Sequence, residues 1–340
     1  LEIAKKWVSP PYSVDGWRLD VAADLGHTAE YNHEFWRKFR RAVKEANPEA
    51  LILAEHYGDP APWLEGDQWD SVMNYDAFME PVTWFLTGME KHSDSFNGDL
   101  LGDGEGFFNA MRYHMSRMQP NSILTAMNEL SNHDHSRFLT RTNGVVGRIG
   151  TAGPEAADRG VKACVMREAV MIQMTWPGAP TVYYGDEAGV CGWTDPDSRR
   201  TYPWGREDLE LIEFHRYMIR IHKGLPVLRR GAVKPLLSGR NVIAYGRMLG
   251  KYQAVTVVNN NGEEQALKVP VWQLGVTDEI SLARIMLTTE EGYNVGALSY
   301  PVRHGFLKLN MPPRSAALFV SYADEFTPVV ASVKAPAGDE

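Results

Sequence analysis

From the first residue to about Leu225, short apolar runs alternate with longer amphipathic stretches, and most of the runs end in or lead to a carboxylate. This alternation is the feature of the sequence that most constrains its fold. The runs lie at residues 14–22, 51–55, 70–75, 122–130 and 180–187. Helical stretches separate them. The first can be capped by Thr28 and closes before Pro48, and later ones cover residues 106–118, 157–176 and 208–223. This order predicts an α/β fold with repeated β/α units and a parallel sheet.

The pattern changes after Pro226. Helical periodicity gives way to short alternating runs, and these are separated by the turn segments NNNGE, EEGYN and NMPPRS. The runs are NVIAYGRM, YQAVTVVNN, QALKVPV, ARIMLTT, FLKLNM and SAALFVSY. We therefore predict three parts: an α/β part over residues 1–226, an antiparallel β-sandwich over 227–322, and a tail over 323–340 without a packing pattern.

Carboxylates stand where the apolar runs of the α/β part end. Asp20 ends the first run, Glu55 the second, the fourth leads to Asp134, and the fifth reaches Asp186 and Glu187. The carboxyl ends of parallel strands meet at one edge, which is where β/α barrels carry their chemistry. A single aspartate after a strand is more often a helix cap or a turn residue. Several at successive strand ends favour a functional site.

Arg18 and His133 accompany these carboxylates. Arg18 lies two residues before Asp20, so both side chains point to one face of the strand, and the guanidinium would keep Asp20 ionised. Glu55 follows LILA, and apolar walls would raise its pKa toward that of a general acid. An ionised and a protonated carboxyl group together are what cleavage of a glycosidic bond requires. The pair Arg18–Asp20 could equally be a buried structural ion pair.

Composition narrows the class of partner. The formal net charge of −8 argues against nucleic acid, and no run reaches the roughly 18 apolar residues of a membrane span. Cys164 and Cys191 have no CxxC or Cys/His neighbours, so metal-thiolate and redox roles are disfavoured. No leader is visible at Leu1, which leaves localisation undetermined, with a weak preference for the cytoplasm.

Six segments together resemble the alpha-amylase family, glycoside hydrolase family 13. DGWRLDVA, ILAE and LSNHDHSR resemble its second, third and fourth sequence regions. GAPTVYYGDEAGV is similar to its final-strand motif, and DPDSRRTYPW to the substrate loop that follows. PWLEGDQWDSVMNY looks like the neopullulanase and cyclomaltodextrinase branch. The resemblance covers about residues 10–225 in detail and implies a retaining hydrolase of α-1,4-linked, and in some members α-1,6-linked, glucans, maltooligosaccharides or cyclodextrins.

The resemblance also implies roles for single residues. Asp20 corresponds to the nucleophile, Glu55 to the acid/base, and Asp134 to the third carboxylate, which grips the sugar at subsite −1. The substrate-binding positions are Arg18, His133, Tyr57 near subsite +1, and the pair Asp195 and Arg199 at subsite −2. A purely structural loop pair remains the alternative for Asp195 and Arg199. After Asp20 this chain reads VAADLGH, whereas the branch typically reads VANE. The resemblance therefore does not predict the specificity on the acceptor side of the site.

The five runs match strands four to eight of the family's eight-stranded barrel. We therefore expect a partial (β/α)8 barrel, with strands one to three supplied by another polypeptide or cut away. Two copies would not close the barrel neatly, because ten strands exceed eight. The calcium-binding asparagine of classical amylases falls outside this sequence, so no metal and no cofactor are expected. Transglycosylation on the same substrates and an inactive amylase-like scaffold remain alternative functions.

Overall fold

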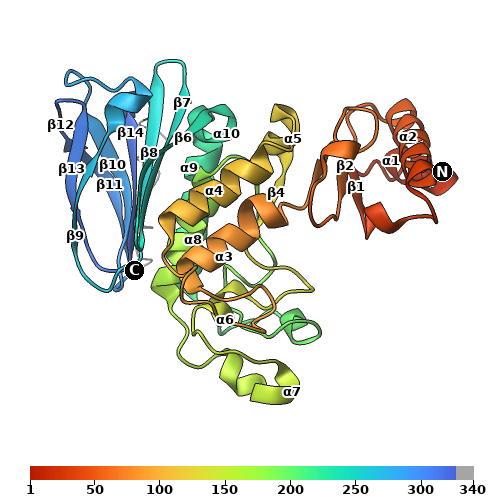
Figure 1. The fold of residues 1–340 in the computed structure, drawn as a ribbon, viewed down its shortest axis with the longest axis horizontal. Coiled ribbons are helices and arrows are strands. Elements are labelled where there is room, and N and C mark those ends of the chain that lie inside the picture. Colours follow the sequence, from red (N-terminus) through yellow and green to blue (C-terminus); the bar gives the residue numbers. More distant parts are fainter. Residues whose placement is uncertain (327–340) are drawn as a thin grey trace, which may run out of the picture.

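Five short parallel strands form the scaffold of the N-terminal part, within the described residues 1–326 of this computed structural model (Figure 1). Their order in space follows their order in the chain. β1, β2 and β3 are adjacent, β4 and β5 are adjacent, and a parallel bridge from Met73 to Met127 joins the two groups. The strands are β1 (Gly16–Leu19), β2 (Leu51–Ala54), β3 (Ser71–Val72), β4 (Met127–Glu129) and β5 (Ala179–Thr181). Within residues 1–326, β1 and β5 do not pair with each other, so each leaves an open edge.

Helices connect these strands, as the rhythm of the sequence predicts. Thr28 caps α2 as expected, because its Oγ1 accepts a hydrogen bond from the Tyr31 amide at 3.2 Å, and α2 ends before Pro48. The helices are α1 (Glu2–Val8), α2 (Ala29–Ala46), α3 (Glu80–Thr87), α4 (Gly104–Met115), α5 (Pro120–Thr125), α6 (Phe138–Arg141), α7 (Ile149–Ala152), α8 (Ala163–Thr175), α9 (Leu209–Gly224) and α10 (Pro226–Arg230). A π-helical segment, Tyr75–Met79, leads into α3. No helix within residues 1–326 has the length and apolar character to cross a membrane.

Strand parity separates the two faces of this sheet. Leu19, Ile52 and Val72 join the cluster that includes Trp36 and Val43 of α2. The other parity places Arg18, Leu53, Met73 and Met127 on the opposite face, where Leu53, Met73 and Met127 pack with Tyr75 and Met79. This smaller apolar cluster forms a floor beneath the strand ends, and the functional side chains stand above it.

All five strands of the α/β part are shorter than the predicted runs, and the fourth and fifth show the reason most clearly. Residues 122–125 of the fourth run belong to α5, which begins at Pro120, because a proline is tolerated in the first helical turn, where its missing N–H costs nothing. The fifth run leaves the sheet after Thr181. Gly185 turns with a φ of 87°, and the Asp186 amide donates to the Tyr183 carbonyl at 3.0 Å. Strand length there is set by turn geometry rather than by the apolar run.

The C-terminal part is a β-sandwich that follows a short helix. α10 spans the predicted boundary at residue 226. A six-stranded antiparallel sheet has the order β11-β10-β14-β8-β7-β6, and β12-β13-β9 lies against it. The strands are β6 (Ala232–Gly239), β7 (Val242–Leu249), β8 (Tyr252–Asn259), β9 (Gln265–Val269), β10 (Leu282–Thr288), β11 (Tyr293–Tyr300), β12 (Val302–Arg303), β13 (Phe306–Met311) and β14 (Ser315–Ser321).

The large sheet is buried on both faces. Ala244, Val255 and Phe319 pack toward the small sheet, whereas Ile243 and Leu318 join the main core around α8 and α9. The N-terminal elements α1, α2, β1 and β2 lie at the far end of the molecule from this sandwich (Figure 1). The apolar cluster that includes Trp36 and Val43 of α2 is therefore separate from the main core around α8 and α9.

The predicted tail begins as folded chain. Residues 323–326 form a 3-10 turn, and the Glu325 carboxylate accepts hydrogen bonds from Lys251 Nζ at 2.5 Å and the Tyr252 hydroxyl at 2.7 Å. Phe326 packs on Tyr252 with ring centroids 5.2 Å apart. The remainder of the predicted tail, 327–340, lies outside the described residues.

Candidate active site at the carboxyl ends of the strands

Asp20 and Glu55 follow two neighbouring parallel strands at the same level. Arg18 pairs with Leu53 and Leu19 with Ala54 in the ladder, and the Glu55 amide donates to the Leu19 carbonyl at 2.8 Å. The alternation of the strands therefore brings Arg18, Asp20 and Glu55 to the face that carries the apolar floor. This is the convergence that the strand-end pattern predicts.

Arg18 bridges the two carboxylates. Its Nη1 is bonded to Asp20 Oδ1, and its Nη2 lies 3.2 Å from Glu55 Oε2 as an ion pair without hydrogen-bond geometry. Its Nε contacts the Met73 sulfur at 3.3 Å, so the guanidinium packs against the apolar cluster beneath the strand ends. The alternative of a buried Arg18–Asp20 pair does not describe the structure, because the Asp20 side chain is 75% exposed and Arg18 also contacts Glu55.

The environments of the two acids differ. The Asp20 side chain is 75% exposed and that of Glu55 only 9%. The hydrogen bond from Arg18 is the main cause that lowers the pKa of Asp20. Burial opposes it, and the charge of Arg18 and the neighbouring Glu55 and His133 act in the same direction as the hydrogen bond. Asp20 therefore stays ionised into acidic solution.

Glu55 does not lie against purely apolar walls, contrary to expectation. Its Oε2 accepts a hydrogen bond from the Val21 amide at 2.9 Å, in addition to the contact with Arg18. Val21 adopts the left-handed region with φ 42° and ψ 43°, which is strained for a β-branched residue and costs on the order of 1–3 kcal/mol. That backbone turn follows directly on Asp20 and contributes an amide donor to Glu55.

His133 and Asp134 lie on the loop after β4, which the loop after β5 holds in place. His133 Nε2 is 3.3 Å from Asp134 Oδ2. The Thr194 hydroxyl and the Asp195 amide, the latter at 3.2 Å, both donate to the Asp134 carbonyl. Ser198 Oγ donates to the His133 carbonyl at 2.7 Å. The two segments that the sequence marked separately are thus one unit.

Asp195 and Arg199 form a pair beside Asp134. Arg199 Nε donates to Asp195 Oδ1 at 2.5 Å, and its Nη2 lies 3.9 Å from Asp134 Oδ1. Both side chains are about half exposed, so the pair can contact a ligand in the open site.

Tyr57 stands beside the acids and is held on three sides. Its hydroxyl lies 2.9 Å from His135 Nε2, its ring stacks on Tyr75 with centroids 4.4 Å apart, and Lys91 Nζ lies 4.8 Å from its ring centroid. Burial raises the pKa of Tyr57 and lowers that of His135 to about 2, so a neutral hydroxyl is hydrogen-bonded to a neutral imidazole. His135 and Lys91 were missed by the sequence reasoning, although His135 stands inside the motif SNHDHSR.

Asp186 is not on the open rim, contrary to the expectation for the fifth run. It is buried and paired with Arg137 Nη1 at 3.0 Å. Arg137 also donates to the carbonyls of Tyr184 and Ser198. Through its pair with Arg137, this carboxylate holds the loop after β4 against the loop after β5.

One group of side chains has the composition of a metal site. Ligand atoms of Glu90, His92 and Asp94 lie within 4.8 Å of one another. Arg148, however, binds both oxygens of Asp94, and the Glu90 oxygens accept from the ring and the amide of His92 at 2.8 Å. A cation would have to displace these donors, so we assign no metal to the group.

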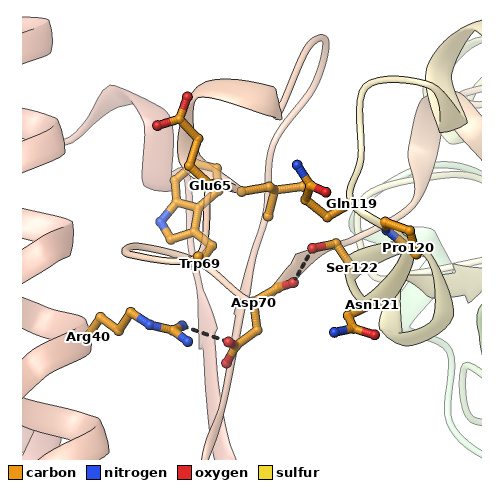
Figure 2. A pocket seen from close by; sticks show the side chains of 10 residues that line it. Arg40, Glu65, Trp69, Asp70, Gln119, Pro120, Asn121 and Ser122 are labelled. Atoms are coloured by element: carbon orange, nitrogen blue, oxygen red, sulfur yellow. Dashed lines mark hydrogen bonds and ion pairs between the residues drawn. The ribbon is translucent and has the colours of Figure 1, made fainter.

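A pocket of about 570 Å³ lies at the opposite ends of the strands (Figure 2). Arg40 Nη1 binds Asp70 Oδ1 at 2.6 Å, and the Ser122 hydroxyl donates to the Asp70 carbonyl at 2.7 Å. Asp70 directly precedes β3, and Ser122 belongs to α5, before β4. The pocket is therefore on the side where the strands begin, where side chains of barrel folds serve stability.

A pair of carboxyl groups at the same edge of the sheet is the arrangement that glycoside hydrolases use. The family described as "Alpha amylase, catalytic domain" matches residues 1–230, and the chain belongs to this family. An antiparallel β-sheet region follows its α/β domain.

Two curated proteins and one solved structure illustrate what this chain is similar to. The chain is 36% identical over 279 residues to neopullulanase 2 of Thermoactinomyces vulgaris, covering 81% of this chain and 41% of that protein. It is 34% identical over 269 residues to a cyclomaltodextrinase of Thermoanaerobacter pseudethanolicus, covering 78% and 41%. A solved cyclomaltodextrinase superposes with a TM-score of 0.72 at 28% identity, covering 94% of this chain and 47% of the other. The chain thus spans about two fifths of the length of these sequence relatives.

Proposed function

We propose that this chain contributes the acid–base machinery of a retaining α-glucoside hydrolase, which acts on α-1,4 and α-1,6 links of glucans, maltooligosaccharides or cyclodextrins. The observation that carries the proposal is the Arg18 bridge between Asp20 and Glu55. It provides one exposed, ionised carboxylate and one buried carboxyl group at adjacent strand ends, as a double displacement needs.

In this mechanism Asp20 attacks the anomeric carbon while Glu55 protonates the leaving oxygen. Glu55 then takes a proton from water, which displaces Asp20 from the sugar. Two inversions retain the α configuration. A retaining pair places the two carboxyl groups roughly 5–5.5 Å apart in the complete enzyme.

The neighbouring side chains bind the sugars. His133 and Asp134 hold the ring at subsite −1, and Asp134 tightens its grip in the distorted transition state. Asp195 and Arg199 bind the sugar at subsite −2. Tyr57, fixed by His135 and Tyr75, lies on the acceptor side. Neopullulanase and cyclomaltodextrinase relatives support α-glucans as the substrate class.

The open edges of β1 and β5 support one further element of this proposal. We infer that chain outside these 340 residues, either contiguous or separate, supplies the other barrel strands and completes subsite −1. Unpaired strand edges otherwise expose backbone N–H and C=O groups and part of the core.

The test is Asp20→Asn in the complete protein. Turnover of maltotetraose, pullulan and β-cyclodextrin should fall by on the order of 10³-fold or more, because the nucleophile is lost while its shape is kept. Asp15→Asn, at the exposed start of the same strand run, is the matched control. The wild-type enzyme should release α-anomers, and the product lengths separate hydrolysis from transglycosylation. Near-normal turnover of Asp20→Asn, or release of β-anomers, would refute the mechanism.

A further inference from the structure

Glu129 is a buried acid at the end of β4 that the proposed mechanism does not use. It is 1% exposed, and its parity in the strand is that of Met127, so it lies on the face of the sheet that carries the site. It stands three residues before Asn132 and five before Asp134. Charged groups this deeply buried are rare unless they have a specific partner.

The partner of Glu129 is the amide group of Asn132. Asn132 Nδ2 donates to Glu129 Oε1 at 2.8 Å and lies 3.3 Å from the Tyr75 hydroxyl. Asn132 Oδ1 accepts hydrogen bonds from the backbone amides of Asp134 and His135, each at 3.0 Å. The oxygen of this side chain must face those two N–H groups, so its NH₂ group must face Glu129. A hydrogen-bond acceptor at position 129 therefore completes the turn that carries His133, Asp134 and His135.

We propose that Glu129 is a positioning residue for Asp134, which it orients through the amide of Asn132. The proposal rests on the function proposed above, since it assumes that Asp134 binds the sugar at subsite −1. A small displacement of such a group is costly, because a misplacement of about 1 Å can reduce the rate about 100-fold.

The charge state of Glu129 suits this role at neutral pH. Burial raises its pKa to about 8, opposed by the hydrogen bond from Asn132 and the charge of Arg18. The charged or titratable groups that face it come from every neighbouring strand end: Arg18, Tyr57, Tyr75, Asp134, Arg141 and Asp186. Two of these groups, Asp134 and Asp186, are carboxylates whose charge repels a carboxylate at position 129.

The proton on Glu129 has a consequence for activity. A protonated Glu129 accepts from Asn132 without adding charge beside Asp134. Above about pH 8 it ionises, adds a negative charge to the interior of the site, and competes for Arg18. Activity should therefore decline on the alkaline side through this group.

Two variants of the complete protein separate these effects. Glu129→Leu removes the acceptor, and kcat on maltotetraose should fall by roughly 10- to 100-fold with a smaller change in KM. Glu129→Gln restores a neutral acceptor, so it should recover most of that loss and keep its activity at pH 9, where the wild type declines. Glu168→Leu, which removes a buried acid of α8 outside the site, should leave kcat unchanged.

A double variant identifies the route of action. If Glu129 acts through Asp134, then Glu129→Leu combined with Asp134→Asn should be no slower than Asp134→Asn alone. The proposal is overturned if the two losses multiply, or if Glu129→Leu keeps wild-type kcat while Asp134→Asn loses it. If Glu129→Leu does not fold, Glu129→Gln decides, and a wild-type alkaline limb in that variant counts against the proposal. An unaffected Asp134→Asn or Asp20→Asn enzyme would instead remove the proposed function.

Discussion

The Arg18 side chain contacts several parts of the candidate site at once. It contacts both acids and rests on the Met73 sulfur, so it sets the geometry of Asp20 and Glu55 together. Because its hydrogen bond lowers the pKa of Asp20, it also extends the pH range in which Asp20 is ionised.

The Arg18 bridge predicts the acidic limb of the pH profile. A depressed carboxylate pKa keeps Asp20 ionised down to lower pH, so Arg18→Gln should move this limb to higher pH. It should also lower kcat in the complete enzyme by about 10- to 100-fold. Arg37→Gln, which breaks an exposed ion pair with Asp67, is the control. An unshifted limb in Arg18→Gln would contradict this role.

Asp195 should act mainly on binding, because the proposed function assigns it to subsite −2, one sugar away from the reacting bond. Asp195→Asn weakens its pairing with Arg199 and should raise KM about tenfold, which corresponds to about 1.4 kcal/mol, with kcat within a few-fold. Initial rates on maltotetraose measure both constants. Asp158→Asn, which disturbs the nearby pair with Arg200, is the comparison. A loss confined to kcat would place Asp195 in the chemistry instead.

Glu168 is a fully buried acid whose two carboxyl oxygens have no hydrogen-bond partner. Burial raises its pKa well above the usual value, against the charges of Arg314 and Arg167. A raised folded-state pKa means that the stability present at low pH is lost as the pH rises above about 4.3, the unfolded value. Relative to Glu168→Leu, the wild type should therefore lose free energy of unfolding between pH 4.5 and pH 8. Urea titrations at the two pH values measure this, with exposed Glu264→Leu as the control.

At the scale of elements, local signals predicted helices better than strands. Thr28, Pro48 and Asp208 mark the ends of α2 and the start of α9 through capping and backbone chemistry that involves only near neighbours. The sequence pattern did not predict β6 and β11, because Pro235 and Gly296 disfavour a strand. Both strands lie at edges of the large sheet, where such residues are tolerated.

The cap of α2 gives a prediction at this scale. Thr28→Ala removes the acceptor of the Tyr31 amide and should reduce the free energy of unfolding by about 1 kcal/mol. Urea denaturation followed by circular dichroism measures the change. Thr277→Ala, at an exposed loop position, should have no comparable effect, and an equal loss in both variants would discount the cap.

At the scale of the whole molecule, the two edges of the parallel arrangement, β1 and β5, have no partner strands within residues 1–326, unlike the inner strands of the sandwich. The sandwich sheet is buried on both faces, whereas β1 and β5 end the parallel arrangement without partners within residues 1–326. Ile3, Trp7 and Tyr12 are exposed apolar side chains near the β1 end.

The uncovered edges predict how the 340-residue chain behaves by itself. It should bind a hydrophobic dye or aggregate, and it should not hydrolyse maltooligosaccharides, because exposed edges and apolar surface favour association. Addition of chain that supplies strands one to three should suppress dye binding and produce activity. Size-exclusion chromatography and dye fluorescence test the first part, and a sharply melting, active monomer would refute the inference.

The sequence by itself determined which residues stand at strand ends, because strand periodicity and turn chemistry depend on near neighbours. Asp20, Glu55 and Asp134 were recognisable in that way, and so was the change from α/β units to antiparallel strands. Tertiary structure alone decided what each acid touches. Asp186 meets Arg137 across 49 positions, Glu55 meets the strained Val21 amide across 34, and Glu129 is buried at the end of β4. Burial and pairing set the charge of a carboxyl group, and both depend on contacts between residues far apart in the chain.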